Sequence, residues 1–135
     1  MNYKSAEIMN AAQLAQYQFE SDTWKRRLFF LLEESVQAKN RIAEILKQPV
    51  DMEMVNELEY FQSGFIEKDR LLCALKEELE SFDRLLLKRI FEERTHAEQI
   101  RNTRKNIRQQ MQFAEQSFEG FQKNFNLFLA ANIVS

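Results

Sequence analysis

The chain has 135 residues and a formal net charge of −2, with 44% hydrophobic and 30% charged residues. This balance is sufficient for one buried core and a solvated surface, and it argues against disorder and against a second domain. The small net charge gives no overall reason to expect nucleic acid or an anionic membrane as the partner.

Turn-forming residues are rare, since the chain has only two glycines and one proline. Sheet folds need turn residues roughly every 8 to 12 positions. This chain is instead rich in Leu, Glu, Gln, Lys, Arg and Ala, which are the strong helix formers. The composition therefore predicts an all-α fold.

A first helix is predicted over about residues 5–47. Its apolar and small residues follow alternating spacings of three and four, the heptad period of a left-handed coiled coil. The members of this first stripe are Leu14, Tyr17, Ser21, Trp24, Leu28, Leu31, Ser35, Ala38, Ile42 and Ile45.

A second helix is predicted over about residues 51–94. Pro49 disfavours helix at the residue before it, and Asp51 is a favourable N-cap. The second heptad stripe is Met54, Leu58, Phe61, Phe65, Lys68, Leu72, Leu75, Leu79, Phe82 and Leu86.

A third helix is predicted over about residues 95–130, because a third stripe is out of phase with the second. Thr95 and Glu98 have the spacing of a capping box, which indicates a turn near Arg94. The third stripe is Ala97, Ile100, Arg104, Ile107, Met111, Ala114, Phe118, Phe121, Phe125 and Phe128.

The three stripes predict a single domain over residues 1–135, in which three long antiparallel helices form a coiled-coil-like helical bundle. The alternative is that the second and third helices are one continuous helix, against which the first helix packs, with dimerisation completing the core. No glycine or proline near residue 94 excludes this alternative.

An up-down-up bundle also predicts which residues lie level with one another. With a turn centred near Pro49, paired positions on the first two helices should sum to about 98. Phe29 and Phe30 would then lie level with Phe65 and Ile66. Phenylalanines of the third helix should approach the same end.

The sequence offers little for catalysis, because it has one histidine and one cysteine and lacks the common phosphate-binding, serine-hydrolase and zinc-protease motifs. Glu93 and His96 have the Glu-x-x-His spacing of di-iron bundles, but such sites need two of these motifs. We expect no enzyme activity, no cofactor, no metal site and no small-molecule substrate, and we interpret His96 as an exposed or capping residue.

Cys73 is the only cysteine, so no internal disulfide can form, and we interpret it as a small buried hydrophobe in a reducing compartment. The longest apolar run, residues 28–32, is far short of the roughly 20 residues that cross a bilayer. The amino-terminal residues lack the apolar core of a signal peptide. We therefore expect no membrane span and a cytoplasmic location.

Charge is segregated along the second half of the chain. Residues 51–83 carry ten acids and three bases, whereas residues 84–108 carry eight bases and three acids. The bases define a candidate basic patch: Arg84, Lys88, Arg89, Arg94, Arg101, Arg104, Lys105 and Arg108. A cationic hairpin tip could bind nucleic acid or another anion, although solvated charges with local ion pairs are the favoured interpretation.

Some apolar residues lie outside the stripes and make two segments apolar on nearly every side. They define a candidate partner interface: Phe29, Phe30, Leu32, Leu85, Leu87, Ile90 and Phe91. Phe113, Phe118, Phe121, Phe125 and Phe128 resemble an aromatic recognition box, but helical spacing favours the core for them. The sequence predicts a non-catalytic interaction, scaffold or adaptor protein that binds itself or another protein through apolar helix faces.

Overall fold

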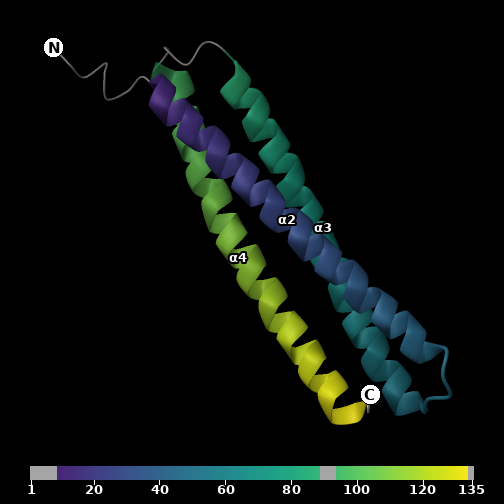
Figure 1. The fold of residues 1–135 in the computed structure, drawn as a ribbon. Coiled ribbons are helices and arrows are strands. Elements are labelled where there is room, and N and C mark those ends of the chain that lie inside the picture. Colours follow the sequence, from purple (N-terminus) through teal and green to yellow (C-terminus); the bar gives the residue numbers. More distant parts are fainter. Residues whose placement is uncertain (1–8, 89–93, 134–135) are drawn as a thin grey trace. The chain divides into compact units, whose positions relative to one another are not determined.

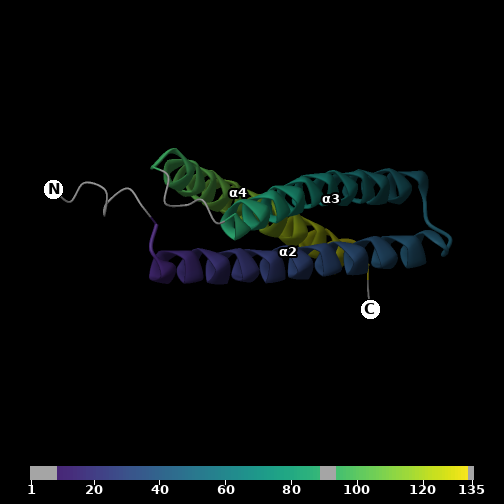
Figure 2. The ribbon, with the colours of Figure 1, turned by 90° about the horizontal axis from the view of Figure 1, so that it is seen from above.

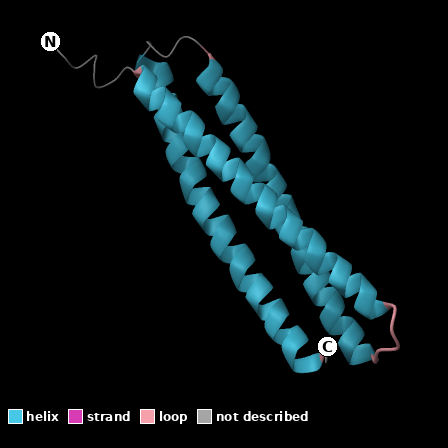
Figure 3. Ribbon diagram, in the orientation of Figure 1, coloured by secondary structure: helices cyan, strands magenta, loops and turns pink. Residues whose placement is uncertain are grey.

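A computed structural model describes residues 9–88 and 94–133, and all regular structure in these ranges is α-helical (Figure 3). The helices are α2 (Ala11–Leu46), α3 (Met52–Leu87) and α4 (Arg94–Asn132) (Figure 1). They pack against each other, so the predicted all-α helical bundle is confirmed. None of the helices in the described ranges combines the length and the apolar character needed to cross a lipid bilayer.

The chain divides into two compact units, each of which contains a segment of all three helices. Unit 1 comprises Met1–Leu28 and Ala74–Gln112, and unit 2 comprises Phe29–Cys73 and Phe113–Ser135. Each unit has its own packing contacts.

Reciprocal hydrogen bonds fix the start of α2. The backbone N–H of Gln13 donates to Asn10 Oδ1 (2.8 Å), and the backbone N–H of Asn10 donates to Gln13 Oε1 (3.1 Å). These bonds satisfy amide groups at the helix end, as in a capping box. The helix therefore begins at Ala11, later than the start predicted near residue 5.

Helix α3 begins where the sequence predicts a second helix. The backbone N–H of Met54 donates to Asp51 Oδ1 at 2.8 Å, which confirms Asp51 as the N-cap. Residues 47–51 are not helical and turn the chain from α2 into α3 in unit 2 (Figure 2).

The heptad stripes form the buried core that their spacing predicts. In the first stripe only Leu14 and Trp24 are half-buried, and every other member is buried. The members of the second and third stripes are also buried, except for five that are half-buried: Met54, Lys68, Arg104, Phe121 and Phe128. Burial every three and four residues holds the helices together through their apolar seams.

Aromatic rings form the core of unit 2 between α3 and α4. The ring of Phe65 lies 5.0 Å from that of Phe121, and the ring of Phe61 lies 5.2 Å from that of Phe125. A later residue of α3 thus contacts an earlier residue of α4. The two helices are therefore adjacent and antiparallel. This arrangement excludes one continuous helix through residues 51–130.

The prediction that Phe29 and Phe30 lie level with Phe65 and Ile66 is wrong. Lys39 of α2 forms an ion pair with Asp69 of α3 at 2.5 Å, whereas a turn centred at Pro49 would bring Lys39 level with a residue ten positions earlier. The non-helical linker lets α3 begin beyond the last turn of α2, which shifts their register. Phe29 and Phe30 are exposed because they lie outside the buried stripe of α2.

Two buried serines of α2 differ in their hydrogen bonding. Ser21 donates to Asp83 Oδ1 at 2.6 Å in unit 1, whereas Ser35 Oγ in unit 2 has no hydrogen-bond partner among the described residues. An unsatisfied buried hydroxyl is unfavourable, and alanine is the better helix former. We expect Ser35→Ala to raise the free energy of unfolding by about 1 kcal/mol and Ser21→Ala to lower it by about 1 to 2 kcal/mol.

Urea unfolding of both variants beside the parent chain measures these changes. Because both substitutions remove a hydroxyl from the same helix, each is the control for the other. Equal changes of the same sign would contradict the assigned difference in hydrogen bonding.

Candidate partner-binding surfaces

The basic patch lies in unit 1, but one of its members is held in the packing. Arg104 donates from Nε and from a terminal nitrogen to the two carboxylate oxygens of Glu20, at 2.5 and 2.7 Å. Its guanidinium also lies 4.9 Å from the ring centroid of Tyr17. The hydrogen bonds to Glu20 raise the pKa of Arg104 above its ordinary value. Arg104 therefore joins α2 to α4 and is not available to a ligand.

The other described bases are more accessible. Arg84, Lys88, Lys105 and Arg108 are exposed, and Arg101 is half-buried with an interaction of its own. Arg101, Lys105 and Arg108 are four and three residues apart, which places them on one side of α4. Arg89 lies outside the described residues, as does the side chain of Arg94. The anion-binding hypothesis stays a prediction that depends on the exposed bases.

The lone histidine and cysteine differ from their sequence-based interpretations. His96 is buried in the first turn of α4, because it lies four residues before the core residue Ile100 and so shares its side of the helix. Cys73 is exposed, because it falls one position after the stripe residue Leu72 and so projects away from the seam. Within the described ranges, no three His, Cys, Asp or Glu side chains gather closely enough to hold a metal ion.

The predicted apolar interface divides between the two units. Phe29 and Phe30 belong to unit 2 and are 66% and 60% exposed, while Leu32 beside them is half-buried. Leu85 is half-buried and Leu87 exposed in unit 1. Ile90 and Phe91 lie outside the described residues.

Phe29 and Phe30 project from different sides of α2, because neighbouring residues of a helix are about 100° apart. Phe30 stands seven residues before Gln37 and fourteen before Glu44, so these three residues follow one face of the helix. Phe29 shares its face with Val36, which is also exposed. Only Phe30 lies on the side of α2 that borders α4.

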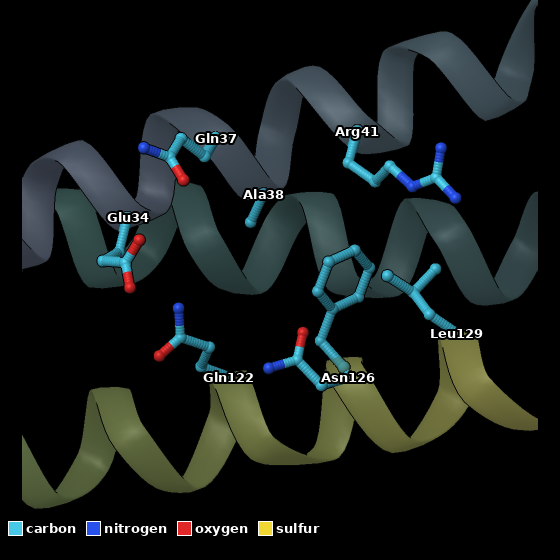
Figure 4. A pocket seen from close by; sticks show the side chains of 8 residues that line it. Glu34, Gln37, Ala38, Arg41, Gln122, Asn126 and Leu129 are labelled. Carbon is cyan, nitrogen blue, oxygen red and sulfur yellow. The ribbon is translucent and has the colours of Figure 1, made fainter. Parts of the chain in front are cut away.

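A groove of about 280 Å³ lies between α2 and α4 in unit 2. Figure 4 shows side chains from both helices along its two edges. Its lining residues are Glu34, Gln37, Ala38, Arg41, Gln122, Phe125, Asn126 and Leu129. Ala38 and Phe125 are buried core residues and form an apolar floor, whereas most of the other lining residues are polar.

A second hollow of about 520 Å³ continues along the same seam toward the end of α2. Arg41 lines both hollows, so they are neighbours along one seam, and together they are here called the α2/α4 groove. The further lining residues are Glu44, Ile45, Gln48, Val50, Asn132 and Ile133. From Glu34 to Gln48 the groove follows four turns of helix, a length of roughly 21 Å.

The chemistry of the α2/α4 groove suits a helix better than a small polar ligand. Its floor is apolar, its walls are dominated by the amides of Gln37, Gln122 and Asn126, and its charges are of both signs. An apolar floor between two helices with a polar rim is the geometry in which an amphipathic helix docks.

Sequence reasoning missed the α2/α4 groove. Its walls stand beside the heptad stripes, where amide side chains lie among the charges that usually flank a coiled-coil seam. Gln37, Gln48, Gln122 and Asn126 carry this signal. It could have been found by examining the flanks as closely as the stripes.

The chain was compared with known proteins. No protein-family model, curated protein or solved structure matches it. The function is therefore argued from the surfaces themselves.

Proposed function

We propose that this chain is a non-catalytic interaction protein whose α2/α4 groove binds an amphipathic helix of another protein. The observation that carries the proposal is the groove itself, a hollow with an apolar floor and a polar rim that follows four helical turns of the seam between α2 and α4 in unit 2. A bundle of three helices with one open seam offers a fourth helix the same heptad packing that holds the three together.

The groove defines the chemistry of the bound helix. The helix spans about 14 residues, because the groove is roughly 21 Å long and a helix rises 1.5 Å per residue. Apolar side chains at positions i, i+3, i+7 and i+10 contact the floor near Ala38 and Phe125. Its flanks carry amide or hydroxyl groups, which can both donate to and accept from the side-chain amides of Gln37 and Gln122.

Phe30 lengthens the binding surface at one end. It stands two turns before Gln37 on the same face of α2 and is 60% exposed. A large exposed aromatic residue at the end of a groove is a typical binding anchor. Phe30 should therefore contribute to affinity, whereas Phe29 on the other face should not.

A displayed library of 14-residue amphipathic helices tests the proposal, because the natural partner does not have to be identified first. We expect selection to enrich helices with an apolar stripe and uncharged polar flanks. Leu129 is half-buried in the groove wall. A lysine there introduces a desolvated charge, so Leu129→Lys should weaken binding of the enriched helices by about tenfold or more.

Leu127→Lys is the matched control, because Leu127 is an exposed leucine of the same helix that does not line the groove. Unchanged binding to this variant is expected. If Leu129→Lys bound the enriched helices as well as Leu127→Lys does, or if no helix were enriched above scrambled sequences, the proposal would be abandoned. Circular dichroism checks that both variants retain their helices.

A further inference from the structure

A second apolar surface lies on the opposite side of α4, along its seam with α3 in unit 2. The exposed large apolar side chains of these two helices include Tyr60 (63%) and Leu71 (45%) from α3, and Phe113 (67%) and Leu127 (58%) from α4. Phe113 and Leu127 are two heptads apart, so they share one face of α4. Neither lies in the α2/α4 groove.

Contacts across the α3/α4 seam place these residues on its outer side. Lys68 donates to Ser117 at 2.6 Å, and the ring of Tyr60 lies 6.0 Å from that of Phe121. Phe113 lies four residues before Ser117, and Leu127 lies two heptads after Phe113, so both share the side of α4 that carries Ser117. Their side chains therefore border the α3 side of α4.

The aromatic contacts also fix the level of each residue. Phe61 packs on Phe125 and Phe65 packs on Phe121. Moving four residues toward the end of α3 therefore corresponds to moving four residues toward the start of α4. Tyr60 therefore lies near the level of Leu127, and by the same register Leu71 lies near the level of Phe113. The surface has one pair of large apolar residues toward each end.

Gly120 lies midway between Phe113 and Leu127 on the same face of α4. A Cβ atom there would meet nothing within 4 Å, so the packing of the chain itself does not require glycine at this position. Glycine inside a helix costs about 1 kcal/mol relative to alanine. A glycine on an open helix face lets the backbone of another helix approach closely.

Gly64, in contrast, is required by the packing of the chain itself. A Cβ atom on Gly64 would lie 2.0 Å from Cζ of Phe121, so this glycine makes room for a ring of the same chain. Among the described residues, nothing fills the space beside Gly120. The two glycines therefore differ, because a ring of the same chain requires glycine at position 64, whereas no described residue requires it at position 120.

We propose that the occupant of the α3/α4 surface is a second copy of this chain, related by a two-fold axis that passes beside Gly120. In this arrangement the two α4 helices run antiparallel, with their closest approach where glycine faces glycine. Phe113 then meets the partner's Leu127, and Leu127 meets the partner's Phe113. A two-fold interface must be complementary to itself in this way.

Helix α3 completes the same pairs. Since Tyr60 lies level with Leu127, the partner's Phe113 also reaches Tyr60. Since Leu71 lies level with Phe113, the partner's Leu127 also reaches Leu71. In the two-fold dimer, each of these four apolar residues thus contacts an apolar residue of the second copy.

The charges on this surface are compatible with the same pairing. The positions of α4 that flank Gly120 on this face are Gln116, Ser117, Lys123 and Asn124, of which only lysine is charged. The two-fold axis brings the partner's Lys123 to the level of Ser117, where Lys68 is already hydrogen-bonded and directed into the seam. Exposed Glu67 stands beside Lys68 and forms an ion pair with Arg70 at 3.1 Å, and its carboxylate can also accept from the partner's Lys123.

Sedimentation equilibrium of the full chain over a range of concentrations tests this dimer. We expect a reversible monomer–dimer equilibrium whose dissociation constant rises about tenfold or more in Phe113→Lys and in Leu127→Lys, because each places a charge in the apolar contact. Phe29→Lys is the control, since Phe29 is equally exposed but lies on α2. A chain that stays monomeric throughout, or equal dissociation constants in all variants, would overturn the proposal.

Gly120→Ala distinguishes the glycine contact from a general apolar effect. Alanine should stabilise the dilute monomer by favouring the helix, yet weaken the dimer by separating the two α4 backbones. Lys123→Glu should also weaken the dimer, and the double variant Glu67→Lys/Lys123→Glu should restore it. A stronger dimer in Gly120→Ala, or no restoration by the double variant, would contradict the two-fold arrangement.

This inference does not depend on the proposed function, because the two surfaces lie on different sides of α4. Leu129→Lys should abolish helix binding and leave the dimer intact, whereas Phe113→Lys should do the reverse. The failure of one proposal is therefore distinguishable from the failure of the other.

Discussion

Replacing Phe65 with alanine is expected to lower the free energy of unfolding by about 3 to 5 kcal/mol, the usual range for truncating a buried phenylalanine. Phe65 is fully buried in unit 2, and its ring contacts those of Phe118, Phe121 and Phe125 at centroid distances of 5.0 to 5.9 Å. Alanine would leave a cavity lined by rings that can relax only partly. Urea unfolding with an unchanged m value measures the loss.

Phe29→Ala is the control for this prediction. Phe29 is 66% exposed, so its truncation removes little buried area and should change stability by less than about 0.5 kcal/mol. If the two variants were equally stable, Phe65 would not be the centre of the unit 2 core.

Replacing Gly64 with alanine is expected to destabilise the chain by about 1 to 3 kcal/mol, although alanine is the better helix former. The added Cβ would lie 2.0 Å from Phe121 Cζ, 2.6 Å from Cε2 and 2.7 Å from Cε1. The ring cannot move freely, because it also packs against Phe61 and Phe65. Overpacking should therefore exceed the gain in helix propensity.

A double-mutant cycle with Phe121→Leu checks the cause of this loss. A smaller side chain at position 121 makes room for the new methyl group, so Gly64→Ala should be much less harmful in the Phe121→Leu background. Additive losses from the two substitutions would show that the destabilisation does not come from the contact between Gly64 and Phe121.

Most of the fold could be predicted from the sequence because its signals are strong and local. Heptad spacing specifies which side of each helix is buried, whatever the neighbouring helix, and the proline and Asp51 mark the start of α3. The register between α2 and α3 could not be predicted in this way. It depends on the path of the non-helical linker and on long-range pairs such as Lys39 with Asp69.

The candidate surfaces were only partly predictable, for a related reason. The sequence identifies Phe29 and Phe30 as apolar residues outside the stripe, but it does not reveal that they project from different sides relative to α4. It assigns Phe113 to the same aromatic group as Phe118 and Phe125, although Phe113 is exposed. Which flank of a helix stays open depends on the register and spacing of the neighbouring helices.

Unit 2 therefore presents two surfaces of different chemistry, one on either side of α4. The α2/α4 groove has an apolar floor, a polar rim and no internal symmetry, which suits a helix of a different protein. The α3/α4 surface has large apolar residues at both ends and a glycine between them, which suits a copy of itself. A dimer of this kind would hold two grooves, so it could bring two partner helices together.

Photo-cross-linking from the α2/α4 groove tests the central claim most directly. A benzophenone amino acid at Gln37 lies in the groove wall, and the same group at exposed Ser63 of α3 serves as the control. In extracts of the cells that make the protein, we expect adducts from position 37 whose cross-linked peptide belongs to an amphipathic helix of another protein, and their loss in Leu129→Lys. Adducts that form equally from both positions, or that persist in Leu129→Lys, would contradict helix binding in the groove.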